Sequence, residues 1–316
     1  MIDVVALGEL LIDFTCVDKN ADGYPTMKAH PGGATTNFLA TLAKYGTSTA
    51  LMGKVGNDAF GKLLIGTLQK LGIETRGMVI ADDVFTTLAF VTLDDSGDRE
   101  FSFARKPGAD TCIAYEELDL SLIYEAKVFH FGTLSLTNEP AKSATYKAVA
   151  YAKEHGKLIT YDPNLRKPLW SSMEDAKEQL LWGLTQADIV KISDNEVDFL
   201  FGLSPEEGAA HIIENFGVKL VFVTCGADGC VFMNRRATGK VAAPKDIAVA
   251  DTTGAGDIFG GSALWMILQL NIAPESLEAA QLEKIAAFAC TAASLSTQKS
   301  GGASSVPSLE DVNRVL

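Results

Sequence analysis

Cysteine and histidine are scarce in this 316-residue sequence, which contains five cysteines and four histidines. The cysteines are odd in number and no two show Cys-x-x-Cys spacing, which argues against a disulfide framework and a zinc site. The histidines are His30, His130, His155 and His211. They show no metal-ligating spacing, so we expect structural or surface roles for them and reduced thiols in a cytoplasmic protein.

Positive charge is also scarce, because 27 Lys and Arg residues stand against 40 Asp and Glu, a net charge of −13. Such an acidic chain repels phosphate backbones, so we expect no nucleic-acid partner and no anionic membrane partner. No apolar run reaches the roughly 18 residues of a membrane span, and the N-terminus lacks the basic segment of a secretory signal. A local basic pocket for a small anion remains compatible with this charge.

Hydrophobic residues make up 47% of the chain, enough for a large core. Short apolar runs alternate with helical patterns, which predicts an α/β fold with a doubly wound, mostly parallel sheet flanked by helices. The predicted strands are 3–8, 49–55, 127–132, 157–162, 188–193 and 219–226. The predicted helices are 36–46, 58–71, 139–155, 174–186, 195–202, 206–216, 257–270 and 276–296.

Two segments, about 10–31 and 85–110, break this alternation. The first runs from an apolar stretch into a loop rich in Gly, Pro and Asp. The second contains a predicted β-hairpin, 85–105, around Asp-Asp-Ser-Gly-Asp. Strands without helices between them do not join a parallel layer easily, so we expect a small sheet that projects from the main body. The sequence thus predicts one domain, 1–316, with this sheet inserted into it.

Polar and glycine-rich residues follow several of the predicted strands. Glu9 and Asp13 come after the first strand, and the segments 162–166, 194–196 and 225–229 come after later ones. Ligands of open α/β sheets bind beyond the carboxyl ends of the strands. We therefore expect a ligand site along this edge.

The stretch ADTTGAGDIFGG, 250–261, places two glycines before a predicted helix. The unpaired N–H groups at a helix start favour an anion, and the carboxylate of Asp257 suits proton abstraction beside a transferring phosphoryl group. A Walker A loop is excluded because no Gly-Lys-Ser/Thr follows, and Phe259 replaces the third glycine of Gly-x-Gly-x-x-Gly. From these residues alone, a plain helix start whose dipole Asp257 complements is an alternative.

Several ordered motifs resemble the ribokinase-like (PfkB) carbohydrate kinase family over nearly the whole chain. They are the 250–261 stretch, His30-Pro-Gly-Gly-Ala-Thr-Thr-Asn37, the turn at 55–61, and Thr224-Cys-Gly-Ala-Asp-Gly229. The second is similar to the family's Gly-Gly-x-x-x-Asn motif and the last to its Thr-x-Gly-x-x-Gly nucleotide turn. The resemblance implies a ribokinase-like fold, an ATP- and Mg²⁺-dependent sugar kinase, a lid formed by the small sheet, and a homodimer through that lid.

The resemblance also implies roles for matching residues. The catalytic base is Asp257, with Gly254, Ala255 and Gly256 as the anion hole. The sugar ligands are Asp13, Gly32, Gly33, Asn37, Arg105 and Arg166, and the ATP contacts are Lys191, Thr224, Gly226 and Gly229. The metal ligands are Glu196 for Mg²⁺, and Asp251 and Thr253 for a monovalent cation such as K⁺.

Plain structural interpretations stay open for several of these residues. Asn37 also suits a cap of its own helix turn, Arg105 a surface position, and Glu196 a solvated helix start. Ser193 stands where the family commonly has asparagine, which departs from its Asn-x-x-Glu motif. Gly32 and Gly33 also suit a tight turn, and Gly229 a plain turn between strands.

Three stretches bear on the substrate: 8–14, 103–110 and 162–170 resemble fructokinases. The last is shared with 2-keto-3-deoxygluconate kinases, and Arg166 suits a phosphate or a carboxylate equally. We expect a fructokinase, with a 2-keto-3-deoxygluconate kinase as the alternative. A catalytically silent sugar-binding regulator is the alternative from another class, and the intact Gly-Ala-Gly-Asp argues against it.

Overall fold

The computed structural model of the protein describes residues 2–19, 21–93 and 99–316. Within them, nine strands form one sheet in the order β13-β12-β11-β10-β9-β8-β1-β4-β5. All neighbours from β5 to β11 run parallel, and β12 and β13 are antiparallel additions at one edge. The strands are β1 Val4–Leu7, β4 Thr49–Gly56, β5 Met78–Ala81, β8 Val128–Gly132, β9 Leu158–Asp162, β10 Ile189–Ser193, β11 Leu220–Thr224, β12 Cys230–Asn234 and β13 Thr238–Val241.

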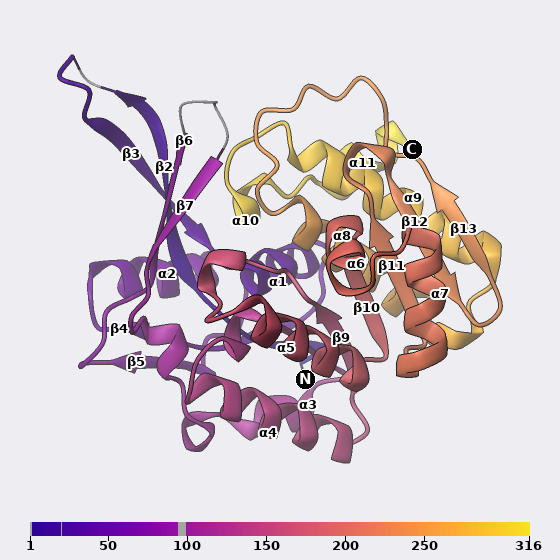
Figure 1. Ribbon diagram of the computed structural model, residues 1–316, viewed down its shortest axis with the longest axis horizontal. Coiled ribbons are helices and arrows are strands. Elements are labelled where there is room, and N and C mark those ends of the chain that lie inside the picture. Colours follow the sequence, from indigo (N-terminus) through magenta and orange to yellow (C-terminus); the bar gives the residue numbers. More distant parts are fainter. Residues whose placement is uncertain (1, 20, 94–98) are drawn as a thin grey trace.

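Helices cover both faces of this sheet (Figure 1). They are α1 Ala34–Lys44, α2 Ala59–Lys70, α3 Leu120–Glu125, α4 Ala141–Glu154, α5 Met173–Gln186, α6 Asp194–Phe201, α7 Pro205–Phe216, α8 Ala255–Leu270, α9 Ala279–Ser296, α10 Gly302–Ser305 and α11 Leu309–Val315. Helices α3 to α7 pack against one face, and α1, α2, α8 and α9 against the other. Side chains of a strand alternate between faces, so Val5 and Leu7 contact the first group while Val4 and Ala6 contact the second.

A separate sheet has the strand order β3-β2-β6-β7 and projects from the main body (Figure 1). Its strands are β2 Leu11–Lys19, β3 Pro25–Gly32, β6 Leu88–Leu93 and β7 Arg99–Ala104. The predicted α/β fold with a small projecting sheet is confirmed, although the expected hairpin turn, 94–98, lies outside the described residues. No helix in the described ranges combines the length and apolar character that a bilayer crossing needs.

Strand β3 corrects the expected loop in the first interrupting segment. It pairs with β2 from Leu11↔Gly32 to Lys19↔Pro25, with one bulge. Its two prolines, Pro25 and Pro31, are compatible with a strand because β3 is at the edge of its sheet, where a missing N–H costs little. Pairing with β2, which composition does not reveal, stabilises this strand.

Candidate active site

A cavity of about 880 Å³ opens between the carboxyl ends of the main strands and the base of the small sheet. The expected site residues that line it are Asp13, Gly32, Gly33, Asn37, Arg166, Lys191, Glu196, Thr224, Gly226, Asp251, Thr253, Gly254, Gly256 and Asp257. The three that do not line it are Ala255, Arg105 and Gly229. The structure therefore brings these residues together at the carboxyl-terminal edge of the main sheet, where the sequence predicted a ligand site.

Helix α8 begins at the cavity without a side-chain cap. Its N-cap residue, Gly254, has φ +80°, a left-handed conformation, and a Cβ there would lie 2.7 Å from the Cα of Gly302. The N–H of Ala255 donates to the carbonyl of Thr252 at 3.2 Å. Among the three expected anion-hole residues, only Gly254 and Gly256 thus face the cavity, at the positive end of the helix dipole.

Asp257 is buried in the first turn of α8, with 9% of its surface exposed. Its Oδ2 accepts a hydrogen bond from Nδ2 of Asn37 at 2.8 Å. Burial raises the pKa of Asp257, while the Asn37 hydrogen bond and the charges of Lys191 and Arg166 lower it. A carboxylate whose pKa is raised takes up a proton more readily, as a general base must.

Asn37 lies one turn inside α1, whose N-cap is Gly33, so the helix-cap interpretation of Asn37 is wrong. Its amide group instead bridges to α8, and its Oδ1 has no hydrogen-bond partner among the described residues. A buried acceptor without a donor is costly, and a hydroxyl group of a ligand would satisfy it. This chemistry fits the expected sugar-ligand role.

Gly32 and Gly33 allow a close approach of three backbone segments. A Cβ at Gly32 would lie 2.0 Å from Oδ2 of Asp13. Gly33 has φ +120°, and a Cβ there would lie 2.3 Å from the carbonyl oxygen of Glu9. Burial raises the pKa of Asp13 to about 6, the charge of Arg166 lowers it, and that of Asp251 raises it. The absence of a side chain at Gly32 therefore leaves room for the Asp13 carboxylate, which lines the cavity.

Lys191 brings a buried positive charge to the start of α8. Its Nζ lies 3.1 Å from Oδ2 of Asp162, and a Cβ at Gly256 would lie 2.8 Å from the same nitrogen. Burial lowers the pKa of Lys191, but the charges of Asp162, Glu196 and Asp257 outweigh it, and the net shift is upward. The lysine is therefore protonated, and this cation beside two glycines and a helix start suits a phosphate group.

Glu196 is buried rather than solvated, and hydrogen bonds already engage both oxygens of its carboxylate. Its Oε1 accepts the N–H of Leu165 at 2.7 Å, and its Oε2 accepts the N–H and the hydroxyl of Ser193 at 2.8 Å each. Ser193, in the place where asparagine was expected, is thus the N-cap of α6 in a capping box. These three bonds occupy most of the roughly four lone-pair positions of the carboxylate.

The end of β11 and the loop after it contribute Thr224, Cys225 and Gly226 to the cavity lining. Gly226 has φ +54° and Gly229 φ +96°, and a Cβ at Gly229 would lie 2.0 Å from the carbonyl oxygen of Val241. Gly229 is therefore required by the turn into β12 and lies outside the cavity, so its expected contact with ATP is not supported.

Asp251 and Thr253 line the cavity next to α8. Oδ1 of Asp251 accepts the N–H of Thr253 at 2.9 Å, and its Oδ2 accepts the N–H of Gly301 at 3.3 Å. The carboxylate thus joins the loop before α8 to the loop before α10. Within the described ranges, no group of three or more His, Cys, Asp and Glu residues is placed to hold a metal ion.

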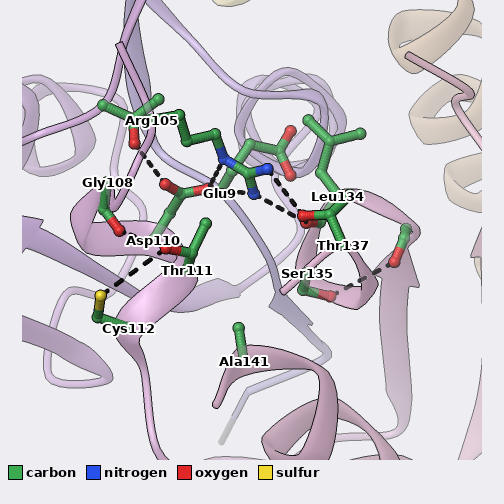
Figure 2. Close-up of polar contacts among 12 residues, drawn as sticks. Glu9, Arg105, Gly108, Asp110, Thr111, Cys112, Leu134, Ser135, Thr137 and Ala141 are labelled. Atoms are coloured by element: carbon green, nitrogen blue, oxygen red, sulfur yellow. Dashed lines mark hydrogen bonds and ion pairs between the residues drawn. The ribbon is translucent and has the colours of Figure 1, made fainter. Parts of the chain in front are cut away.

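Arg105 was expected either to bind the sugar or to lie on the surface. It does neither, because it is buried and lies outside the cavity lining. Its Nε donates to Oδ2 of Asp110 at 2.8 Å, one terminal nitrogen donates to Thr137 Oγ1, and the other to the carbonyl of Leu134, at 2.8 Å each. Figure 2 shows the guanidinium between Asp110 on one side and Leu134 and Thr137 on the other. An arginine held on both sides in this way is not free to bind a ligand.

Glu9 lines the cavity close to Arg105 (Figure 2), on the edge where we expected a ligand site, although the family resemblance implied no role for it. It is 3% exposed, and its Oε1 accepts the N–H of Ala34 at the start of α1. Burial raises the pKa of Glu9 to about 7, against hydrogen bonds that lower it. The signal was its position directly after the first strand, at the edge where ligands bind.

The raised pKa of Glu9 predicts a pH-dependent effect on stability. Ionising Glu9 is harder in the folded state than in the unfolded state, whose pKa is near 4.5, so stability is lost as pH rises from about 4.5 to about 7. Glu9→Gln removes this loss and should be more stable than wild type by about 3 kcal/mol at pH 8, and by less than about 1 kcal/mol at pH 5. Urea unfolding at both pH values measures this difference in the free energy of unfolding between variant and wild type. A difference that does not change with pH would contradict the raised pKa of Glu9.

His130 is buried, and its Nδ1 lies 2.9 Å from Oγ1 of Thr160. Its ring stacks on Phe38 with centroids 3.8 Å apart. Burial lowers the pKa of His130 to about 3, so the ring is neutral and its role is structural, as expected. His30, by contrast, lines the cavity, which the expectation of structural or surface roles did not include.

Known proteins are similar to this chain in sequence and in fold. Residues 1–309 match a family model described as pfkB family carbohydrate kinase. Fructokinase-1 of Oryza sativa subsp. japonica is 40% identical over 317 residues, which cover 99% of this chain and 97% of that protein.

Solved structures show the same similarity. A fructokinase with bound ATP from Xylella fastidiosa superposes with a TM-score of 0.91 at 28% identity, covering 99% of this chain and 97% of that one. A double-mutant fructokinase from Vibrio cholerae O395, in a form with fructose, ADP and potassium ion bound, superposes with a TM-score of 0.86 at 28% identity, covering 100% and 98%.

Proposed function

Since this chain belongs to the pfkB family of carbohydrate kinases, we propose that it is a fructokinase, which transfers the γ-phosphoryl group of ATP to a hydroxyl of fructose. The observation that carries the mechanism is the buried carboxylate of Asp257 at the uncapped start of α8, beside the charge of Lys191. A base, a helix start and a cation at one point suit phosphoryl transfer to an alcohol. Fructose as the acceptor is supported by the 40% identity to a fructokinase over nearly the whole chain.

In this mechanism the sugar lies at the end of the cavity formed by the small sheet. Asp13 accepts hydrogen bonds from sugar hydroxyls, and Oδ1 of Asn37 accepts one more. Asn37 also fixes Oδ2 of Asp257, which leaves Oδ1 of Asp257 to take the proton of the attacking hydroxyl. As that proton leaves, the hydroxyl oxygen bonds to the γ-phosphorus and the bond to the ADP oxygen breaks.

ATP is the second substrate and enters from the other end of the cavity, over the start of α6 and the loop after β11. Thr224 and Gly226 line that end, and Lys191 with the start of α8 faces the transferring phosphoryl group. These groups stabilise the charge of the transition state because they are fixed before the reaction begins. Arg166, which lies near enough to Asp13 and Asp257 to shift their pKa values, is a further cation for the phosphate or the sugar.

The metal ions are assigned by the donors that the site offers. Mg²⁺ would enter with ATP and supply positive charge at its phosphates. Because the Glu196 carboxylate already accepts three hydrogen bonds, it would act on this ion through its charge, and it positions the start of α6. The oxygens of Asp251 and Thr253 fit a monovalent cation such as K⁺. Such a cation would add positive charge near the anion hole.

The projecting sheet is the proposed lid of a single domain, 1–316, which excludes water from the phosphoryl group when both substrates are bound. Val17 in β2, which is 58% exposed, and Tyr24 directly before β3, which is 71% exposed, suit a homodimer through this sheet. We also propose a cytoplasmic location, in agreement with five free cysteines.

The direct test is ADP release from ATP and Mg²⁺ with a panel of acceptors: fructose, glucose, ribose, 2-keto-3-deoxygluconate and adenosine. We expect turnover with fructose to exceed that with each other acceptor. Dominant turnover of the keto acid would replace the proposed substrate and keep the mechanism. Binding of sugar with no ADP release would favour the catalytically silent regulator.

A further inference from the structure

The buried charged side chains of Glu9, Arg105 and Asp110 lie close together (Figure 2), and Arg105 directly follows β7 at the base of the small sheet. Arg105 and Asp110 form an ion pair with 2.6 Å between a terminal nitrogen and Oδ2, and their side chains are only 3% and 2% exposed. Oδ1 of Asp110 accepts the hydroxyl of Thr87. Leu134, whose carbonyl binds Arg105, itself lines the cavity, so the ion pair lies directly behind the cavity wall.

Glu9 stands in front of this pair, in the cavity wall. The charge of Asp110 raises its pKa and that of Arg105 lowers it, which places Glu9 within electrostatic reach of both. Arg105 contributes +1 and Asp110 −1, and Glu9 adds negative charge when it is ionised. This wall therefore presents a neutral to negative potential, even though an arginine lies behind it.

The chemistry of this wall bears on which sugars can enter. A sugar acid needs an unpaired cation to replace the water that its carboxylate loses on binding. Arg166 also lines the cavity, but it already lies close enough to the carboxylates of Asp13 and Asp257 to shift their pKa values.

At this wall Arg105 would supply the cation if it were free, because its guanidinium lies directly behind the wall. Its bonds to Asp110, Thr137 and Leu134 remove this possibility, and the Glu9 carboxylate would repel the incoming anion.

We propose that Asp110 and Glu9 are specificity-determining residues that make the site select neutral sugars over sugar acids. Asp110 neutralises Arg105 and keeps it from the substrate, and the carboxylate of Glu9 repels the carboxylate of a sugar acid. This proposal rests on the proposed kinase function and names its substrate class. Asp110 acts through Arg105, so it is a positioning residue, whereas Glu9 lines the cavity itself. The uncharged hydroxyls of fructose are not penalised by either carboxylate.

The expected effect follows from the charge that each variant removes. Asp110→Asn keeps the shape of the side chain and an oxygen for Arg105, but it leaves the arginine with an uncompensated charge. A unit charge at roughly 10 Å, with an effective dielectric constant near 20, changes a binding constant by about tenfold or more. Glu9→Gln removes the repelling charge and should act in the same direction.

The test is the ratio of kcat/KM for fructose to kcat/KM for 2-keto-3-deoxygluconate, measured at pH 8 for wild type, Asp110→Asn and Glu9→Gln. A ratio within one preparation does not depend on the folded fraction, so loss of stability alone cannot move it. We expect the ratio to fall by about tenfold or more in each variant. Asp119→Asn is the matched control, because Asp119 pairs with Arg76 at 3.5 Å on the exposed surface, and its ratio should equal that of wild type.

The outcomes separate this proposal from the proposed function. If wild type phosphorylates fructose but the ratio is unchanged in both variants, the specificity proposal is overturned and the kinase function stands. If wild type does not phosphorylate fructose, the proposed function itself fails. If Asp110→Asn does not fold, Glu9→Gln decides alone, because its carboxamide retains the acceptor for the N–H of Ala34.

Discussion

Asp257→Asn is expected to lower kcat by about a thousandfold, within the range that general bases contribute. Asparagine has the shape of aspartate and can still bind Asn37, but it cannot take the proton of the attacking hydroxyl. The start of α8 and the charge of Lys191 stay in place, so binding of both substrates should change little. Initial rates of ADP release at saturating fructose and ATP measure the loss.

The same substitution should not destabilise the fold, and this separates a catalytic role from a structural one. Burial raises the pKa of Asp257, so the folded state disfavours the charged carboxylate, and removing that charge relieves the penalty above the ordinary pKa. We expect a melting temperature equal to or higher than that of wild type at pH 8. A variant that folds and keeps more than about a tenth of wild-type kcat would rule out Asp257 as the base.

Gly254→Ala is expected to lower kcat/KM by about a hundredfold, comparable to the loss of one hydrogen-bond donor of an anion hole. The added methyl group would lie 2.7 Å from the Cα of Gly302 and 3.1 Å from Nδ2 of Asn37. In addition, φ +80° is unfavourable for alanine, so the start of α8 must shift. Such a shift moves the N–H groups away from the transferring phosphoryl group.

Gly260→Ala is the matched control, because Gly260 lies in the same helix and a Cβ there would only touch the ring of Phe38 at 3.5 Å. This variant should retain activity within about threefold of wild type and gain slightly in helix propensity. Steady-state kinetics of both variants, with circular dichroism as a check of folding, make the comparison. Equal losses in the two would mean that alanine disturbs α8 as a whole, and that Gly254 has no special part in the anion hole.

Local patterns predicted the position of the site and six of the nine strands described in the main sheet, and they missed β5, β12 and β13 at its two edges. Buried parallel strands read as continuous apolar runs, and the run 188–193 became β10, Ile189–Ser193. The carboxyl ends of such strands meet at one edge, so the residues after them could be grouped without knowledge of their contacts. The glycines before Asp257 also indicated an anion site, because the unpaired N–H groups at a helix start favour an anion.

Partners that come from distant parts of the chain could not be predicted in this way. The two groups that hold the terminal nitrogens of Arg105 belong to residues 29 and 32 positions away, on the segment after β8. Only the folded arrangement reveals that this arginine is occupied. Gly229 was misplaced for a related reason, because the backbone that crowds it belongs to β13, on the far side of a hairpin.

The most direct test of the central claim is ³¹P NMR of purified protein with ATP, Mg²⁺ and fructose, which identifies the phosphorylated product itself. The proposed mechanism predicts that a phosphomonoester of fructose appears in an amount equal to that of ADP. It also predicts that the Asp257→Asn variant forms this product far more slowly than wild type. Inorganic phosphate in place of a sugar phosphate, or no consumption of ATP by protein that binds fructose, would contradict it.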